Sequence, residues 1–225
     1  MSEPYPSIKN VYTRDPDTNI ITTEFSDPVF GHLLKAPWEV TEKLDGTSIR
    51  LVLDMEGTYT VRGRTDKSQL PPPLLDYCMG LEAKVRDAYG NSGANVCLYG
   101  EGVGKGIQEH GNRYGDEQHF RLFDVQIRRY PLSIWFTRQR VQVAAKVLGI
   151  PHAPFLGQLP LDMAISLWLE YPQAPKSRIF DGVPEGWVLR PVGDLRFRSG
   201  EPIRVKIKER DFKVLRGEWY LRGEQ

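Results

Sequence analysis

A lysine and an aspartate stand two positions apart in the stretch Glu42-Lys43-Leu44-Asp45-Gly46-Thr47. Residues i and i+2 of an extended chain project to the same side, so Lys43 and Asp45 share a face. The glycine that follows them allows the backbone to approach a ligand closely. A lysine can act as a nucleophile where its surroundings disfavour the charged form. The same short pattern is also typical of a solvated hairpin end, so the rest of the chain has to decide between the two interpretations.

Other charged residues lie beside glycines or on one face of a predicted strand. They are Arg64, Glu101, Glu185, Lys206 and Lys208. Charged side chains are rarely buried unless they are paired, and packing alone does not account for so many of them at strand ends. If they converge in the fold, they favour an anionic ligand held together with a metal ion.

A glycine run, Gly100–Gly106, follows a predicted strand but does not form a phosphate-binding loop. A Walker loop would need a glycine where Tyr99 stands and a hydroxyl residue where Gly106 stands, and the spacing also fails the Rossmann fingerprint. The residue of interest in this run is therefore its acid, Glu101.

Hydrophobic periodicity predicts an antiparallel-rich α+β fold. Strands are predicted over residues 38–43, 48–54, 58–62, 95–99, 120–127 and 202–208. Helices are predicted from Pro71 to a C-cap at Gly90, from an N-cap at Ser133 through residues 135–148, and over residues 161–171.

Composition excludes several classes of protein. No stretch approaches the ~20 apolar residues of a membrane span, and the N-terminus lacks a signal region, so we expect a cytoplasmic protein with no membrane partner. The two cysteines and four histidines lack the spacing of a structural metal site. Residues 196–216 hold eight basic and three acidic side chains. Such a segment suits a polyphosphate ligand, and a solvated strand face is the alternative.

In their order along the chain, these motifs resemble the motif series of covalent nucleotidyltransferases, the superfamily of polynucleotide ligases and mRNA capping enzymes. The motifs are Lys43-Leu44-Asp45-Gly46, Gly63-Arg64-Thr65, Tyr99-Gly100-Glu101, Phe123-Asp124, Glu185-Gly186-Trp187-Val188 and Lys206-Ile207-Lys208. The stretches Glu42–Thr47, Gly63–Asp66 and Gly100–Gly102 are most similar to its RNA ligase family. Any one motif is weak, but six in the same order over residues 38–210 are specific.

The resemblance implies one ATP-grasp-like adenylation domain over residues 1–225, with antiparallel sheets flanked by helices. Residues 1–37 would form N-terminal strands and loops, and residues 38–210 the catalytic motif region. Only seventeen residues follow Lys208, which leaves no room for a C-terminal OB-fold, so we expect a minimal single-domain form.

The resemblance also implies a reaction. Lys43 would attack the α-phosphate of ATP to form a lysine–AMP phosphoramidate, AMP would pass to a 5′-phosphate end, and a 3′-hydroxyl would displace it to seal the strand. Glu42, Asp45 and Gly46 would belong to the nucleotide site, Arg64 would hold phosphate, and Glu101 would bind the ribose hydroxyls. The remaining implied roles are adenine stacking by Phe123 (or Phe120), metal binding by Glu185 and Glu101, and α-phosphate contacts by Lys206 and Lys208.

Electrostatics supports these roles. A free lysine with the ordinary pKa of ~10.4 is only about 0.1 % neutral near pH 7.4, a deficit of roughly 4 kcal/mol. Neighbouring cations such as Lys206, Lys208 and Mg²⁺ or Mn²⁺ disfavour the charged form and then stabilise charge on the transferring phosphate.

One departure and several alternatives stay open. Many RNA ligases carry Asn two residues after the motif glycine, where this chain has Ser48, which leaves the 5′-phosphate contact in doubt. The expected partner is RNA, with a nicked duplex or a DNA–RNA hybrid as further substrates. A minimal DNA ligase, a capping-type guanylyltransferase, and a non-catalytic nucleotide- or RNA-binding module are the alternative functions.

Overall fold

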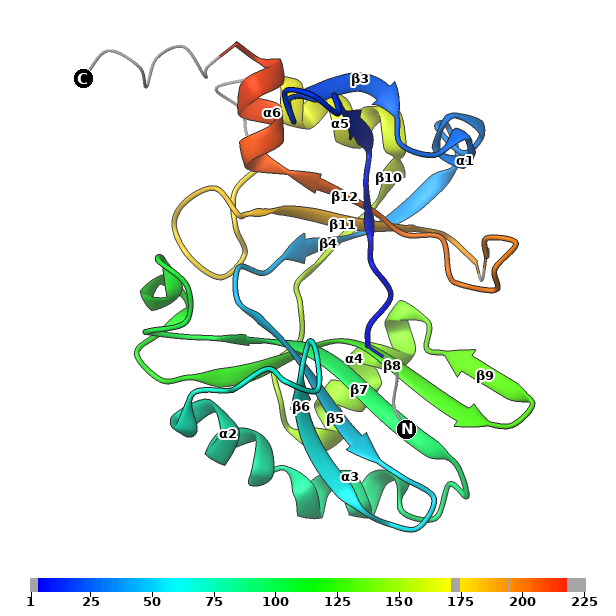
Figure 1. The fold of residues 1–225 in the computed structure, drawn as a ribbon, viewed down its shortest axis with the longest axis vertical. Helices are drawn as coiled ribbons and strands as arrows, with labels where there is room; N and C mark the ends of the chain where they lie inside the picture. The colour runs from blue at the N-terminus through cyan, green and yellow to red at the C-terminus, as the bar shows by residue number, and fades with distance from the viewer. Residues whose placement is uncertain (1–3, 171–174, 194, 218–225) are drawn as a thin grey trace. The chain divides into compact units, whose positions relative to one another are not determined.

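The computed structural model describes residues 4–170, 175–193 and 195–217. The chain forms two compact units (Figure 1). Unit 1 comprises Met1–Pro6 and Asp45–Ala153, and unit 2 comprises Ser7–Leu44 and Pro154–Gln225. Each unit contains a five-stranded sheet and helices, which confirms the predicted α+β class. A single adenylation domain over residues 1–225 stays a prediction.

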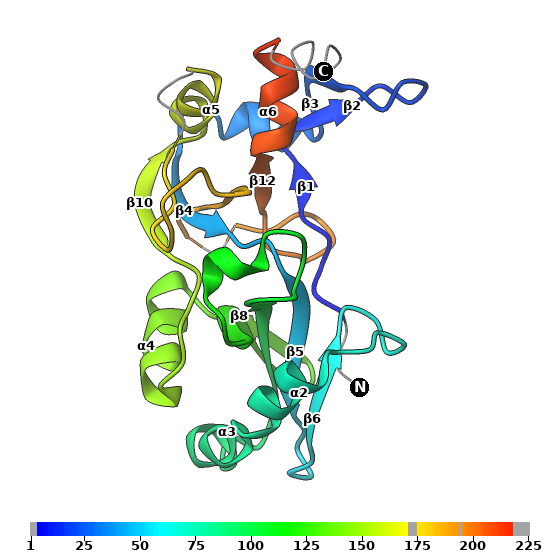
Figure 2. The ribbon, with the colours of Figure 1, turned by 90° about the vertical axis from the view of Figure 1, so that its left-hand side faces the viewer.

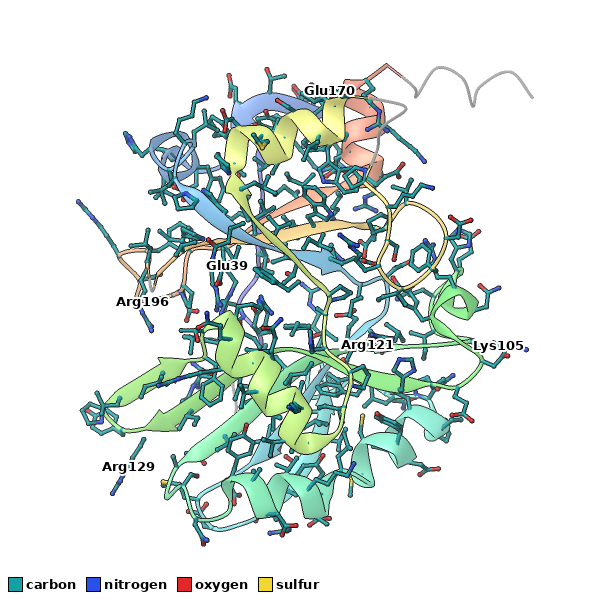
Figure 3. The ribbon with its side chains drawn as sticks, turned by 180° about the vertical axis from the view of Figure 1, so that it is seen from behind. Glu39, Lys105, Arg121, Arg129, Glu170 and Arg196 are labelled. Atoms are coloured by element: carbon teal, nitrogen blue, oxygen red, sulfur yellow. The ribbon has the colours of Figure 1, made fainter. Side chains whose placement is uncertain are left out.

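Unit 1 is built on an antiparallel sheet. Its strands are β5 (Thr47–Leu53), β6 (Tyr59–Gly63), β7 (Asn95–Val103), β8 (His119–Arg129) and β9 (Leu132–Trp135). Their spatial order is β6-β5-β7-β8-β9. The helices of this unit are α2 (Pro72–Met79), α3 (Glu82–Tyr89) and α4 (Arg138–Leu148), with a 3₁₀ turn, η1, at Gly111–Tyr114. Seen from behind, α4 lies across the strands (Figure 3).

Alternation along β5 decides which side chains face the helices of unit 1. Ile49, Leu51 and Leu53 are buried in a core shared with residues of α2, α3 and α4. Complete burial of each such side chain contributes about 1.5–3 kcal/mol. Ser48 and Arg50 therefore project from the opposite face of the sheet.

Unit 2 is built on a second sheet. Its strands are β1 (Lys9–Asn10), β4 (Pro37–Lys43), β10 (Phe155–Pro160), β11 (Gly186–Pro191) and β12 (Val205–Lys208). They lie in the order β1-β12-β11-β4-β10, and only β1 and β12 pair in parallel. A separate ribbon joins β2 (Tyr12–Arg14) to β3 (Ile21–Phe25), and the helices are α1 (Pro28–His32), α5 (Leu161–Leu169) and α6 (Glu209–Leu215).

One face of this second sheet is apolar and the other carries lysines. Figures 1 and 2 show α5 and α6 on the same side of β4, β11 and β12. Trp38 and Val40 of β4 are buried on that side with Val205 and Ile207 of β12. The residues that alternate with them along β4 and β12 project to the opposite face. We call it the lysine face, because it carries Lys43, Lys206 and Lys208.

Two helix predictions need correction. The single helix expected from Pro71 to Gly90 is divided into α2 and α3 at Gly80, where the Leu81 amide bonds the Cys78 carbonyl in a tighter turn. Glycine favours this break because it is a poor helix former.

The helix expected from an N-cap at Ser133 begins later. Residues Leu132–Trp135 form β9, in which Ile134 pairs with Ile127, and α4 is capped by the Thr137 hydroxyl. Pairing with β8 prevails over the local capping signal here. The left-handed Gly149 ends α4 as expected.

The predicted end of the last of these helices, at Tyr171 before Pro172, lies outside the described residues, within which α5 ends at Leu169. None of the helices in the described ranges is long and apolar enough to cross a membrane.

Candidate active site

Lys43 is the last residue of β4, and its side chain is 24 % exposed. Its Nζ atom donates to Glu185 Oε2 at 2.5 Å and lies 3.4 Å from the Leu44 carbonyl oxygen. Glu185 stands immediately before β11, 142 positions further along the chain. Antiparallel pairing of β4 with β11 joins these two distant positions. The predicted nucleophile and the predicted metal ligand therefore form a charge-assisted hydrogen bond.

Gly186 lies between the two lysine-bearing strands. It pairs with Lys43 on one side and with Lys208 on the other. A Cβ atom at this position would lie 2.0 Å from the Ile207 carbonyl oxygen and 2.9 Å from the Lys208 Cα atom. Only glycine therefore allows β11 and β12 to approach closely enough to hold the two lysines in one row.

We expect the variant Gly186→Ala to be destabilised by about 1–3 kcal/mol, because the methyl group meets backbone that cannot move away without separating the strands. Urea unfolding measures the change. The variant Gly31→Ala is the control, since its added Cβ meets only the Phe25 ring at 3.6 Å. Equal stability of Gly186→Ala and the unmodified protein would contradict the close approach.

Lys206 and Lys208 alternate with buried residues on β12 and share the lysine face with Lys43. Burial lowers the pKa of Lys208, and the nearby positive charges of Arg210 and Lys43 lower it further, while Asp211 and Glu185 oppose the shift. This concentration of positive charge suits an anionic ligand such as a phosphate.

The predicted basic segment 196–216 is not one surface. Arg204 is buried, and the lysines of β12 face away from α6, which carries Arg210 and Lys213. Lys206 and Lys208 are therefore the part of this segment that shares a face with Lys43.

Glu42 is buried on the opposite face from Lys43, with 2 % of its surface exposed. Its carboxylate accepts hydrogen bonds from Ser177 Oγ at 2.6 Å and from the Arg178 amide at 2.8 Å. These bonds fix the segment that leads to Glu185. The predicted contact of Glu42 with the nucleotide stays a prediction.

Glu101 lies on β7 of unit 1, in register with Ser48 of β5 and Arg121 of β8. The three side chains share the face of the sheet opposite the helices, which we call the Glu101 face. The serine that departs from the common ligase pattern is thus a direct neighbour of the predicted ribose-binding acid.

Arg121 was not recognised from the sequence as a site residue, and Figure 3 labels it on β8. Its Nε atom donates to His119 Nε2 at 3.1 Å, and His119 Nδ1 lies 3.2 Å from the Glu117 carbonyl oxygen. These partners place the ring proton on Nδ1. Burial lowers the pKa of His119, the carbonyl raises it, and Arg121 lowers it. A neutral His119 thus orients Arg121 on the Glu101 face. In the sequence, the i, i+2 spacing of His119 and Arg121 could have indicated that both lie on one face of β8.

The turn Asp45-Gly46 is held by the loop that joins β7 to β8. The Tyr114 hydroxyl accepts from the Asp45 amide at 2.9 Å, and Gln108 Nε2 donates to the Gly46 carbonyl at 2.9 Å. The Arg113 guanidinium lies 3.8 Å from the Asp45 carboxylate. A Cβ atom on Gly46 would lie 2.2 Å from the Gly102 carbonyl oxygen. The glycine run that matched no phosphate motif therefore opens a loop that positions the motif turn.

We expect Tyr114→Phe to slow adenylation about fivefold, since the variant loses one hydrogen bond to the turn, which is worth about 1 kcal/mol. The rate of covalent labelling by ATP measures the effect. Tyr59→Phe is a matched control, because the Tyr59 hydroxyl bonds the Cys78 carbonyl in the same unit and touches no residue of the turn. If both variants slow labelling equally, the effect comes from stability rather than from the turn.

Arg64 is exposed in a loop that follows β6. Arg50, only 1 % exposed, lies beneath this loop and donates to the Gly63 carbonyl at 3.1 Å and to Asp66 Oδ1 at 2.9 Å. Hydrogen bonds from Arg62 and Arg50 lower the pKa of Asp66. Arg50 and Arg62, whose roles were not predicted from the sequence, therefore hold the loop that carries Arg64.

The two candidate aromatic residues for adenine differ in burial. Phe120 is fully buried in the core of unit 1, against Gly100. Phe123 is half-buried, and its ring centroid lies 4.9 Å from that of Tyr5, edge-on. Of the pair, only Phe123 is partly exposed.

A divalent ion would have few protein ligands here. Among the residues that the structure describes, no group of three or more His, Cys, Asp or Glu side chains could hold a metal. Glu185 beside Lys43 and Glu101 beside Ser48 each offer one carboxylate. Single carboxylates suit Mg²⁺ or Mn²⁺, which keep several waters and bind substrate phosphates.

Comparison with known proteins identifies the family. Residues 36–208 match the RNA ligase family. The chain therefore belongs to the RNA ligase family. The matched residues start and end two positions before the range 38–210 expected from the motifs. A search of curated protein sequences gave no match.

Solved structures share the fold. A Naegleria gruberi RNA ligase variant with ATP and Mn has a TM-score of 0.60 and 22% identity, and the match covers 94% of this chain and 60% of that chain. An apo variant of the same enzyme gives 0.59 and 21%, covering 94% and 59%. An archaeal ATP-dependent RNA ligase gives 0.57 and 13%, covering 94% and 50%. The chain thus spans three fifths or less of the length of these three structures.

Proposed function

We propose that this protein is an ATP-dependent RNA ligase that works through a lysine–AMP intermediate. The observation that carries the proposal is the row of Lys43, Gly186 and Lys208 across three strands, with Glu185 hydrogen-bonded to Lys43. Family membership supports RNA as the substrate class. The structures of the Naegleria enzyme with ATP and Mn support the same nucleotide here.

In the first step, the neutral Lys43 Nζ attacks the α-phosphorus of ATP. A P–N bond forms, the bond from the α-phosphorus to the bridging oxygen breaks, pyrophosphate leaves, and the attacking nitrogen loses its proton. Lys206 and Lys208 offset the negative charge that develops on the α-phosphate oxygens. Glu185 holds the lysine at the end of β4 before reaction.

The other predicted residues take the roles that the family resemblance implies. Glu101 binds the ribose hydroxyls, Phe123 stacks on adenine, and Arg64 holds a phosphate. Asp45 and Gly46 form the turn that follows the nucleophile, and the Asp45 carboxylate lies within reach of Arg113. Glu185 and Glu101 would each offer a carboxylate to Mg²⁺ or Mn²⁺, and the metal would supply charge neutralisation at the triphosphate.

In the later steps, a 5′-phosphate oxygen of the RNA attacks the phosphorus of lysine–AMP, and Lys43 is released. A 3′-hydroxyl then attacks the phosphorus of the 5′-phosphate and loses its proton to water. The new phosphodiester forms, the bond from that phosphorus to the bridging oxygen breaks, and AMP leaves. The substrate is RNA with 5′-phosphate and 3′-hydroxyl ends, single-stranded or at a nick, including a nick in a DNA–RNA hybrid.

Incubation with α-labelled ATP or GTP and Mg²⁺, followed by a denaturing gel, tests the proposal. Label from ATP alone, released when 5′-phosphorylated RNA is added, is the expected result. Label from GTP would indicate capping-type chemistry, and label from ATP that is released only by nicked DNA would indicate a DNA ligase. A folded protein that takes no label would instead be a binding module.

A further inference from the structure

The hairpin that joins β8 to β9 exposes an unusual set of side chains. Tyr130 at its tip is 98% exposed, Leu132 is 65% exposed and Ile134 is 46% exposed. Arg129 is also exposed and pairs with Leu132 across the hairpin. Figure 1 shows the two strands running together to a free end, and Figure 3 labels Arg129 there. Adjacent exposed apolar residues on one element are typical of an interaction surface.

The sequence that includes this hairpin carries charge of one sign. The 37 residues from 125 to 161 contain no Asp or Glu but five Arg and Lys residues. Of these, Arg138 is buried and donates to the Phe123 carbonyl at 3.0 Å. Arg129 on the hairpin, and Arg140 and Lys146 on α4, are exposed. Exposed positive charge of this kind is complementary to a phosphate backbone.

We propose that the β8–β9 hairpin, residues 128–134, binds the RNA that the enzyme seals. Arg129 contacts a backbone phosphate, and the Tyr130 ring stacks on a base or ribose. The inference rests on the proposed function, since it assigns a binding surface to the same substrate. RNA is favoured over a protein partner because an exposed aromatic ring beside an arginine provides base stacking and phosphate contact together. None of the ligase motifs includes a residue of this hairpin.

Binding of a 5′-phosphorylated oligoribonucleotide, single-stranded and annealed into a nicked duplex, tests the proposal. The variants are Arg129→Ser and Tyr130→Ala, and Lys84→Ser on α3 is the control that removes a positive charge from an exposed position of the same unit. We expect each hairpin variant to weaken binding about tenfold. Arg129→Ser should also reduce the slope of log affinity against log salt by about one. Covalent labelling by ATP, which needs no RNA, should continue at the normal rate.

Two results would overturn the inference. One is unchanged RNA affinity and salt slope in both hairpin variants. The other is equal weakening in Lys84→Ser, which would mean that any positive charge matters. Failure of the proposed function gives a different result, because the unmodified protein would then take no label from ATP. If the protein is labelled and seals RNA while the hairpin variants bind as well as it does, only the hairpin assignment fails.

Discussion

Replacement of Lys43 by arginine is expected to abolish covalent AMP labelling, a loss of more than about 10³-fold, while the fold is retained. Arginine keeps the positive charge and a donor for the Glu185 carboxylate, which lies 2.5 Å from the lysine nitrogen. A guanidinium cannot lose its proton in a protein, so it is not a nucleophile. The substitution therefore separates the electrostatic role of Lys43 from its covalent role.

Gel labelling with α-labelled ATP, together with thermal unfolding, measures both roles. The side chains of Lys43 and Glu185 are 24% and 29% exposed, so their ion pair contributes no more than about 1 kcal/mol, and Lys43→Ala should unfold at nearly the same temperature. Residual label on Lys43→Arg would show that another residue carries AMP. Loss of label accompanied by unfolding would leave the nucleophile to be identified by mapping the labelled peptide of the unmodified protein.

Replacement of Lys208 by methionine is expected to slow adenylation by about 10²–10³-fold, the usual effect of removing a group that stabilises charge in the transition state. Methionine keeps the apolar stem of the half-buried side chain, so β12 should retain its pairing with β11. Single-turnover rates of labelling at saturating ATP measure the effect. Lys213→Met on α6 is the matched control, because its ammonium group bonds Glu209 at 2.8 Å on the other side of the sheet.

The pH dependence of the adenylation rate tests the role of the Lys208 charge independently. Burial and the charges of Arg210 and Lys43 lower the pKa of Lys208, so its positive charge is lost at a lower pH than that of an ordinary lysine. Adenylation that uses this charge should decline on the alkaline side at a pH below the pKa of an ordinary lysine. In Lys208→Met that decline should disappear. An identical alkaline limb in both proteins would show that Lys208 does not contribute charge to the reaction.

The strands that carry the candidate site residues of unit 2 were predictable because the motifs preserve local strand patterns. The alternation of Lys206 and Lys208 with buried Val205 and Ile207 is a period-2 pattern, and the structure has β12 at that position. The pattern before Lys43 likewise predicts β4, within one residue at its start. In a strand with one buried face, the alternation of apolar and polar residues specifies which side chains point to the core.

Positioning residues were not predictable in the same way. Tyr114 and Gln108 hold the Asp45-Gly46 turn from a loop more than sixty residues away in the chain. Neither residue is part of a motif, and nothing in the sequence distinguishes a loop hydroxyl or amide with a positioning role from one without it. The pairing of Ile134 with Ile127 also prevailed over a helix-capping serine, because strand pairing satisfies the backbone of that segment more fully than a first helical turn.

The sequence by itself determined the α+β class, the membership of the RNA ligase family and the identity of the candidate nucleophile, since each is written in contiguous residues with a fixed period or order. Tertiary structure alone decided that Glu185 bonds Lys43 and that Glu42 faces the core. It also decided that Phe120 is fully buried whereas Phe123 is partly exposed. The physical reason is that pairing between strands and burial depend on residues far apart in the chain. A local pattern specifies which face of a strand is polar, but not which neighbour will lie across from it.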